Sequence, residues 1–252
     1  MPLRVGLVYT QMKLGRAYEH LNNLKVEIDR FIQGKPYTIT RYDYLPQNWH
    51  ILCVKQHITP DILGVLIGEF AHAIRSGLDN LAWQLALLTT DKPNRLTAFP
   101  IESECPLPSN KSFKEKISNI PPDALKIIES LQPYTSQPMI KLHPLWRINK
   151  LANLDKHQVV PISSINFALA VHDVSMTYGR RDDEINHTTE IAIPLAEKDK
   201  VKFDVECTGI EFGDPINTSD ALSDFTVDWE GLRHIYEFVR YDAVPKFEQF
   251  FK

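Results

Sequence analysis

The sequence predicts an α+β protein, mainly a helical bundle with a small antiparallel β-sheet in its C-terminal half. Two observations predict this class. Apolar residues recur at three- and four-residue steps over several segments, as in helices that bury one face. Between residues 159 and 212, β-branched residues and two-residue alternation replace that pattern, which is typical of strands. Because helical segments stand before and after the strands, we expect one domain over residues 1–252.

Within this domain, we expect residues 12–157 to form the bundle, and residues 158–252 to form the sheet plus a C-terminal helix packed on the bundle. The first helix is predicted over residues 12–33, because apolar residues mark one face and Gly34-Lys35-Pro36 ends the pattern. Two alternating segments then predict a β-hairpin over residues 37–57.

A long helix is predicted over residues 59–90. Thr59 suits its N-cap, and Pro60 suits its first turn. Its apolar face comprises Leu63, Ile67, Phe70, Ile74, Leu78, Leu81, Leu85 and Leu88. This spacing predicts a helix that is buried along one side.

Prolines make residues 91–120 rich in loops, with a short helix near residues 113–117. Two further helices are predicted over residues 121–132 and 144–157, the first of them opened by Pro121-Pro122-Asp123. Both have apolar residues at helical spacing, so we expect them to pack on the bundle.

The C-terminal third begins with predicted strands over residues 159–178, 188–195 and 201–212. Gly179-Arg180-Arg181-Asp182-Asp183 predicts a polar turn between the first two. A last helix is expected from Thr226 or Asp228, and Pro245 is expected to kink it.

The composition bounds the function. Hydrophobic residues make up 43% of the 252 residues and charged residues 24%, as in soluble globular proteins. The net charge of -4 excludes a global basic field for nucleic acid, so such a contact needs a local patch. Cys53, Cys105 and Cys207 form no Cys-x-x-Cys pair, which fits a reducing cytoplasm. No window is apolar enough for a membrane span or a signal peptide, so we expect a cytoplasmic protein with no membrane partner.

A group of polar residues interrupts the long helix. At 100° per residue they fall on one arc about 140° wide, opposite the apolar face. This polar arc comprises Glu69, His72, Arg75, Ser76, Asp79 and Asn80. Buried polar groups are unfavourable unless they are paired or used. Two interpretations stay open: Arg75 pairs with Asp79 and Glu69 with His72, or the arc lines a pocket or a subunit seam.

A second polar cluster ends the helix predicted over residues 144–157. It comprises Asn153, Asp155, Lys156 and His157. A cationic Lys or His is favoured at a helix C-terminus, so these residues can also be read as ordinary terminal and surface groups. The functional interpretation is that they face a cleft where the helix meets a strand.

The two groups together suggest chemistry on a phosphodiester, because Arg holds phosphate and His moves protons near neutral pH. The catalytic candidates are His72, Arg75, Asp79 and His157. The substrate-binding candidates are Asn80, Asn153, Asp155 and Lys156. No cofactor or metal is expected. Glu69-x-x-His72 has the spacing of di-iron bundles, but a second Glu-x-x-His is absent.

The segment His72-Ala-Ile-Arg75-Ser-Gly-Leu-Asp79-Asn80 resembles a pattern in uncharacterised bacterial proteins of similar length, His-x-x-Arg-Ser-x-Leu-Asp-His. Their Asn-x-Asp-Lys-His is similar to residues 153–157 here. The Arg-x4-His part is also similar to the signature of HEPN domains, helical bundles that are often dimeric and often metal-independent ribonucleases of toxin and antiviral systems. The resemblance implies that Arg75 acts on an RNA phosphodiester. Since Asn80 replaces the family's histidine and cannot move protons, His72 or His157 would supply the imidazole.

We therefore expect a HEPN-like ribonuclease or nucleotide-binding protein in antiviral defence or stress response, with RNA or a nucleotide as ligand and a homodimer as assembly. One alternative is a non-catalytic binding or assembly module, whose polar arc forms a buried interface with a second copy or a protein partner. Another is a metal-dependent enzyme that uses Glu69 and His72.

Overall fold

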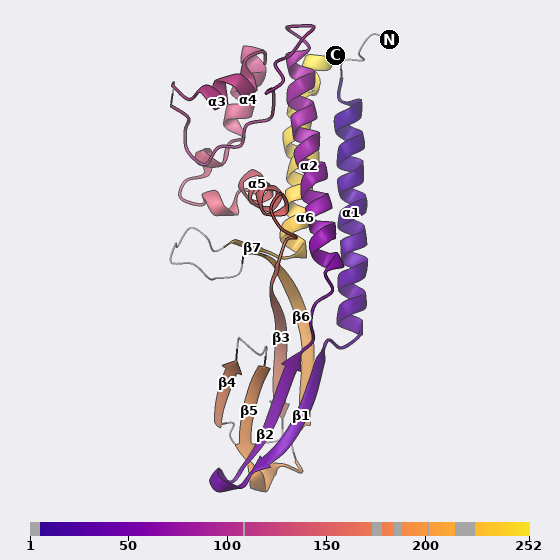
Figure 1. The fold of residues 1–252 in the computed structure, drawn as a ribbon, viewed down its shortest axis with the longest axis vertical. Coiled ribbons are helices and arrows are strands. Elements are labelled where there is room, and N and C mark those ends of the chain that lie inside the picture. Colours follow the sequence, from indigo (N-terminus) through magenta and orange to yellow (C-terminus); the bar gives the residue numbers. More distant parts are fainter. Residues whose placement is uncertain (1–5, 108, 173–177, 184–187, 201, 215–224) are drawn as a thin grey trace. The chain divides into compact units, whose positions relative to one another are not determined.

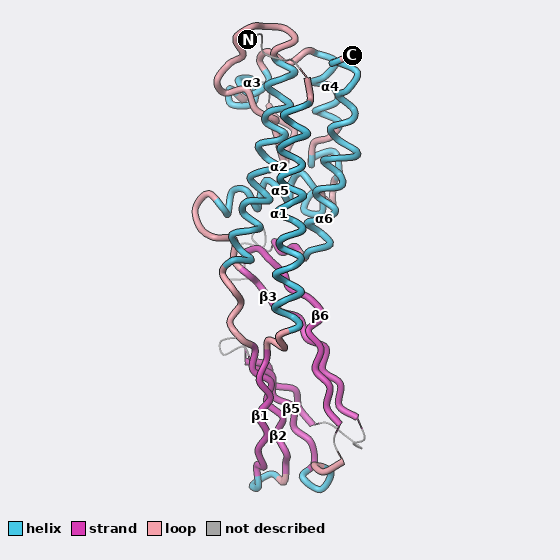
Figure 2. The backbone as a smooth tube through the Cα atoms, turned by 90° about the vertical axis from the view of Figure 1, so that its right-hand side faces the viewer, coloured by secondary structure: helices cyan, strands magenta, loops and turns pink. Residues whose placement is uncertain are grey.

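The computed structural model describes residues 6–107, 109–172, 178–183, 188–200, 202–214 and 225–252. It confirms the α+β class, with long helices and small antiparallel sheets (Figures 1 and 2). By its internal contacts, the chain divides into two compact units. The first contains Met1–Lys25, Asp61–Ser163 and Phe212–Lys252, and the second contains Val26–Pro60 and Ser164–Glu211. The hairpin predicted over residues 37–57 belongs to the second unit, together with strands from the C-terminal half.

In the first unit, helix α2 (Ile62–Ala86) lies between the other long helical segments (Figures 1 and 2). Helix α1 (Val8–Gln33) runs antiparallel to it, since Thr10 contacts Asn80 and His20 contacts Glu69. Helix α6 (Trp229–Glu237) packs on α1, where the rings of Tyr18 and Tyr236 are 5.4 Å apart.

The apolar face predicted for α2 is the centre of this core. All but one of its eight predicted positions are 0% exposed, and the exception is Leu88, which is 40% exposed. Leu88 follows the last helical residue, Ala86, so its side chain is no longer directed by the helix. The predicted start was also too early, because α2 begins at Ile62 and Asp61 occupies the N-cap position instead of Thr59.

Three shorter helices complete the first unit, all close to their predicted places. They are α3 (Lys111–Ile117), α4 (Pro122–Ser130) and α5 (Pro144–Asp155). Side chains at two of the starts satisfy backbone donors: Asn110 accepts a hydrogen bond from the Phe113 N–H, and His143 accepts one from the Leu145 N–H. Proline stands in the first turn of α4 and of α5. A backbone N–H in the first turn has no acceptor within the helix, so proline, which lacks this group, fits there.

Helix α5 and the segment after it approach α2 at two glycines. A Cβ atom at Gly64 would overlap the carbonyl oxygen of Val160, and one at Gly68 would lie 2.6 Å from Cγ of Asp155. Only glycine leaves space for these contacts. The end of α5 therefore lies against the first half of α2, with the Asp155 carboxylate beside Gly68.

The second unit contains a four-stranded antiparallel sheet in the order β1-β2-β5-β4. Its strands are β1 (Tyr37–Tyr44), β2 (Trp49–Gln56), β4 (Tyr178–Asp183) and β5 (Thr188–Pro194). The predicted hairpin is present, with Tyr37 opposite Gln56 and Tyr44 opposite Trp49. Buried side chains alternate along the central strands, where Leu52 stands opposite Ile191.

Strand β4 corrects one prediction, since residues 179–183 were expected to form a polar turn. They pair with β5 over Tyr178–Asp183, with a register irregularity between Tyr178 and Arg180. Strand pairing uses backbone groups, and charged side chains are common on an edge strand. Of the strand predicted over residues 159–178, residues 173–177 lie outside the part of the chain that the structure describes.

A three-stranded sheet has the order β3-β6-β7, formed by β3 (Ile162–His172), β6 (Lys202–Asp214) and β7 (Phe225–Val227). Its end includes Gly213, whose φ of +139° and close approach to the Phe225 carbonyl both require glycine.

The C-terminal helix changes geometry before Pro245, as its kink prediction implied. After α6, residues Phe238–Ala243 form π-helical turns, and Val244–Phe251 form a 3-10 helix with Pro245 in its first turn. Proline cannot donate the helical hydrogen bond, so the change of geometry lies where a regular α-helix would be interrupted. Phe247 anchors this end through an edge contact with Phe99, at 6.5 Å between ring centroids.

Candidate functional site

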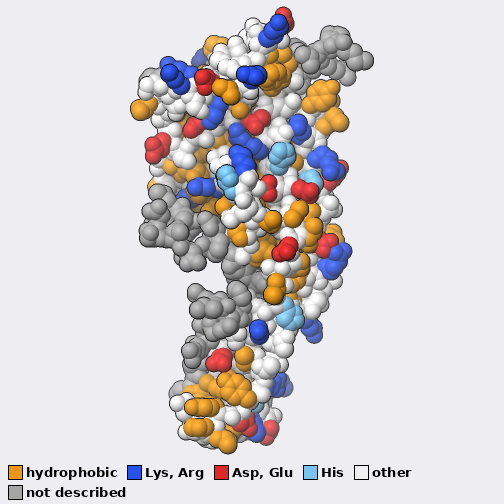
Figure 3. Space-filling model, in the orientation of Figure 1, with side chains coloured by type: hydrophobic (Ala, Val, Ile, Leu, Met, Phe, Trp, Pro, Cys, Tyr) orange, Lys and Arg blue, Asp and Glu red, His pale blue; other side chains and the backbone are white. Residues whose placement is uncertain are grey.

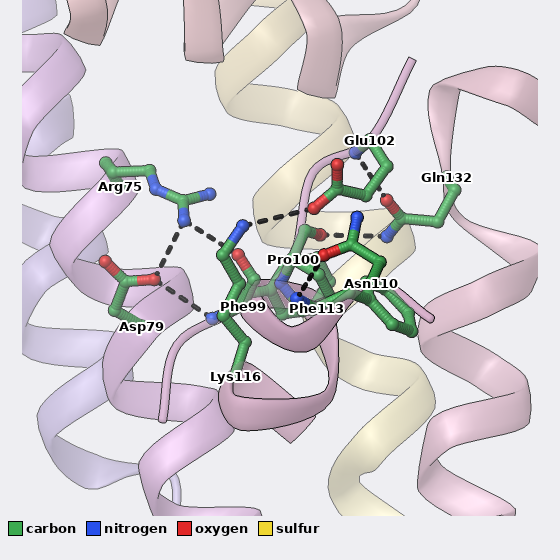
Figure 4. Close-up of polar contacts among 9 residues, drawn as sticks. All are labelled: Arg75, Asp79, Phe99, Pro100, Glu102, Asn110, Phe113, Lys116 and Gln132. Atoms are coloured by element: carbon green, nitrogen blue, oxygen red, sulfur yellow. Dashed lines mark hydrogen bonds and ion pairs between the residues drawn. The ribbon is translucent and has the colours of Figure 1, made fainter. Parts of the chain in front are cut away.

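Arg75 and Asp79 both bind the backbone of Phe99 (Figure 4). Arg75 Nη2 donates to the Phe99 carbonyl at 2.7 Å and lies 3.1 Å from Asp79 Oδ1. The same Asp79 oxygen accepts a hydrogen bond from the Phe99 N–H at 3.0 Å. The predicted pair at i, i+4 is therefore present, and it clamps a loop. Burial lowers the pKa of Arg75, which Asp79 and Glu102 oppose, and an arginine remains charged at any ordinary pH.

The clamped loop continues into a second set of polar contacts (Figure 4). The buried Gln132 side chain donates to the Pro100 carbonyl at 2.9 Å and accepts from the Glu102 N–H at 2.9 Å. Lys116 pairs with Glu102 at 3.1 Å. Residues 99–102 are thus held from α2, α3 and the end of α4, and Arg75 is one part of that network.

Other residues of the polar arc bind α1. Thr10 Oγ1 donates to Asn80 Oδ1 at 3.0 Å, and Lys13 Nζ donates to Ser76 Oγ at 2.7 Å. Glu69 does not pair with His72 as one interpretation predicted; its Oε2 lies 3.0 Å from Nδ1 of His20. The arc therefore faces a second helix of the same chain, with its exposed side chains at one end.

A pocket of about 560 Å³ lies between α1 and α2 and is closed at one end by the residues that follow α5. We call it the α1–α2 pocket. It is lined by Lys13, Arg16, His20, Val65, Gly68, Glu69, His72, Ala73, Ser76, Asp155 and Val159. In the space-filling view, histidine side chains lie among Lys, Arg, Asp and Glu over the helical unit (Figure 3).

The pocket brings together residues from both predicted polar groups, including Glu69 and Ser76 of the polar arc. His72 comes from the polar arc, and Asp155 comes from the second polar cluster. Neither side chain makes a hydrogen bond or ion pair with any residue that the structure describes, although all their polar neighbours in the pocket have such partners. Two unpartnered polar groups at the wall of one pocket are available to a ligand.

The wall from α1 was missed by sequence reasoning. Lys13, Arg16 and His20 stand at steps of three and four residues, beside the buried Leu14 and Ala17. Such a stripe on a helix flank usually means a solvated surface, so only its proximity to α2 gives it significance. Its partners limit its freedom: Lys13 binds Ser76, and Arg16 forms an ion pair with Glu19.

The other predicted site residues lie elsewhere. Arg75 and Asp79 bind the Phe99 loop, and neither lines the pocket. Asn153 and His157 are exposed, and Lys156 Nζ donates to Asn153 Oδ1 at 3.1 Å. The structure therefore brings His72 and Asp155 to one place and leaves His157 outside the pocket lining.

The metal-enzyme alternative needs a set of donor side chains around one point. Within the described ranges, no group of three or more His, Cys, Asp or Glu side chains is arranged to hold a metal. Glu69 and His72 of the metal-enzyme alternative line the same pocket, but Glu69 is paired with His20.

Across the part of the chain that the structure describes, none of the helices has both the length and the apolar character that crossing a bilayer requires. Comparisons of the chain with protein-family models, with curated proteins and with solved structures give no match. The geometry of the α1–α2 pocket is therefore the basis for the functional proposal.

Proposed function

We propose that this protein is a HEPN-like ribonuclease or nucleotide-binding protein, and that the α1–α2 pocket holds the phosphate of its ligand. The observation that supports the proposal is the arrangement of two cationic and two imidazole side chains around this one pocket: Lys13, Arg16, His20 and His72. Cations attract phosphate oxygens, and imidazoles exchange protons near neutral pH. A chain with a net charge of -4 needs such a local patch to bind a phosphate ester.

In this proposal, Lys13 and Arg16 contact the phosphate. On a ribonucleotide phosphodiester, the 2′-oxygen attacks phosphorus and the bond to the 5′-oxygen breaks, which leaves a 2′,3′-cyclic phosphate. One imidazole accepts the 2′-hydroxyl proton, and the other donates a proton to the leaving 5′-oxygen. We assign these roles to His20, positioned by Glu69, and to the unpartnered His72.

Six residues predicted from sequence have no part in this chemistry, and the exposed Asn153 is one of them. Arg75 and Asp79 hold the Phe99 loop. We therefore assign phosphate binding to Lys13 and Arg16 and not to Arg75. His157 and Lys156 lie outside the pocket lining. Asn80 accepts its hydrogen bond from Thr10 and links the two helices.

The test uses a fluorescent single-stranded RNA, with binding followed by anisotropy and cleavage followed on a gel. We expect His72→Ala to lower the cleavage rate about a hundredfold or more, the contribution of a general acid or base. His157→Ala is the matched control, because it removes an exposed histidine outside the pocket lining, and its rate should equal that of the wild type. Equal cleavage rates for His72→Ala and the wild type would contradict the catalytic proposal.

A second candidate is a non-catalytic binding or assembly module. The contacts of Arg75, Asp79 and Asn80 favour it. These residues belong to the segment that resembles the HEPN signature, and because they bind other parts of the same chain they are not available for catalysis. This candidate predicts RNA binding that weakens in Lys13→Ala and Arg16→Ala, with no cleavage by the wild type. The same binding and gel experiments therefore decide between the two.

We also propose a homodimer in the cytoplasm that acts in antiviral defence or stress response. The likeness of the Arg75 segment to HEPN domains supports the assembly and the setting, and three cysteines without a Cys-x-x-Cys pair support a reducing compartment. Light scattering over a tenfold range of protein concentration tests the dimer. A mass equal to one chain throughout the range would contradict it.

A further inference from the structure

Asp155 occupies a position in the α1–α2 pocket that only a glycine neighbour allows. It is the last residue of α5, and its carboxylate lies against the backbone of Gly68 in the first half of α2. A Cβ atom at Gly68 would lie 2.6 Å from the carboxylate carbon, so a larger residue there would displace the carboxylate from this position. The carboxylate is half-buried and is held at the pocket wall by packing.

This carboxylate has no partner among the described residues, whereas the pocket's cations are already engaged. Lys13 donates to Ser76, and Arg16 pairs with Glu19. An ionised carboxylate accepts hydrogen bonds and donates none. It repels a phosphate group, so the part of a ligand beside Asp155 must instead carry hydroxyl or N–H donors.

The two ends of the pocket therefore suit different parts of one ligand. Gly68 marks the Asp155 end, and Ser76 marks the Lys13 end. At 1.5 Å per residue, these positions are about 12 Å apart along α2. Val65 and Val159 line the pocket as well, with 40% and 54% of their surface exposed, and offer apolar contact to a sugar or base.

We propose that the α1–α2 pocket is specific for ribonucleotides, with the phosphate at Lys13 and Arg16 and the ribose hydroxyls donating to Asp155. A nucleotide carries a phosphate and a vicinal diol on one molecule, and carboxylates bind ribose hydroxyls in other nucleotide sites. Asp155 is then the residue that distinguishes ribose from deoxyribose. The assignment rests on the proposed function, because it requires phosphate binding in the same pocket.

The experiment is calorimetric titration with adenosine 5′-monophosphate, with its 2′,3′-dideoxy analogue and with inorganic phosphate. We expect the wild type to bind the ribonucleotide about tenfold or more tighter than the analogue, as for hydrogen bonds to a charged group. Asp155→Ala should remove this difference and leave binding of the analogue unchanged or stronger.

Gly68→Ala provides an independent variant, because it displaces the carboxylate without removing its charge, and it should also remove the preference for ribose. Gly15→Ala is the matched control, since a Cβ there meets no atom within 4 Å, and it should retain the preference. Circular dichroism confirms that each variant is folded; if Gly68→Ala is not, Asp155→Ala carries the test.

The outcomes separate the two proposals. Equal affinity of the wild type for the ribonucleotide and its dideoxy analogue would overturn the role of Asp155 while phosphate binding stands. A preference for ribose that survives Asp155→Ala would also overturn it. If neither nucleotide nor inorganic phosphate binds, the proposed function fails, and this inference fails with it.

Discussion

Arg75 and His72 stand three residues apart on α2, yet their side chains meet different surroundings. The Arg75 side chain is 19% exposed and donates to the Phe99 carbonyl, whereas His72 is exposed at the α1–α2 pocket without a partner. The two residues look alike in the sequence, as polar positions on one helix. In the structure, Arg75 holds a loop, whereas the His72 side chain is available to a ligand. The difference comes from what lies opposite each side chain.

Asp79→Ala tests the structural role at this scale. The substitution leaves the Phe99 N–H and the Arg75 guanidinium without their shared acceptor, so we expect it to lower the free energy of unfolding by about 1–3 kcal/mol. Urea unfolding followed by circular dichroism measures this loss.

The matched control is Glu237→Ala, which removes an Arg–carboxylate pair of the same i, i+4 spacing, in which both side chains are over 40% exposed. Exposed pairs of this kind contribute little, so its loss should stay below about 0.5 kcal/mol. Equal losses for the two variants would show that Asp79 does not anchor the Phe99 loop.

Helix α5 has a polar group at each end, and each one depends on a local feature of the element. Asp155 at its last position packs on Gly68. At its start, His143 Nδ1 accepts a hydrogen bond from the Leu145 N–H at 3.2 Å, and the His143 ring packs edge-on against Phe238. This acceptor role requires an unprotonated Nδ1, because a histidine cation donates from both nitrogens.

The His143 cap predicts a pH dependence of stability. Burial lowers the pKa of His143 below its ordinary value of 6.5, so the folded state binds fewer protons than the unfolded chain as the pH falls. The stabilisation of the folded state by neutral His143 is therefore complete above about pH 6.5, the pKa of histidine in the unfolded chain. It is lost as the pH falls through the lower pKa that His143 has in the folded state.

His143→Asn separates this effect from that of the other histidines. Asparagine is a good N-cap that does not titrate in this range, so we expect the variant and the wild type to have similar free energies of unfolding near pH 7.5. Between pH 7.5 and 5, the free energy of unfolding should fall less in the variant than in the wild type. Urea unfolding at both pH values gives the comparison. An unchanged loss in His143→Asn would show that the cap does not titrate.

At the scale of the whole molecule, the chain forms two compact units built from interleaved segments. Each unit has fully buried side chains of its own, such as Phe70 in the first and Leu52 in the second. The segments of each unit come from distant parts of the chain, so neither unit is a continuous stretch that composition alone would reveal. The candidate site lies wholly in the first unit.

Leu52→Ala tests whether the second unit opens by itself. We expect the free energy of opening of the second unit to fall by about 2–5 kcal/mol, as for a buried leucine truncated to alanine. Hydrogen exchange measured by mass spectrometry should accelerate in β1, β2 and β5 and remain unchanged in α2.

The control is Leu45→Ala, at a site in the same unit that is 72% exposed, which should leave exchange unchanged throughout. Equal acceleration in α2 and in the four-stranded sheet after Leu52→Ala would show that the two units open only together.

The sequence by itself determined the α+β class, the hairpin and the α-helices that the structure describes, because the period of apolar residues reflects local backbone geometry. It also identified His72 and Asp155 as chemically notable. It did not indicate the short 3-10 helices between the α-helices. It misread residues 179–183 as a turn, because the pairing of an edge strand depends on a neighbour rather than on its own side chains.

Only the tertiary structure decided which polar groups meet. Besides Asp79, Arg75 has a backbone carbonyl as its partner, which no residue type reveals. The stripe from Lys13 to His20 likewise lines a site only because α2, about fifty residues further along the chain, packs beside it. The close approach at Gly68 then adds Asp155 from a third helix. Contacts between distant segments leave no periodic signal in the sequence, since they depend on how whole elements pack.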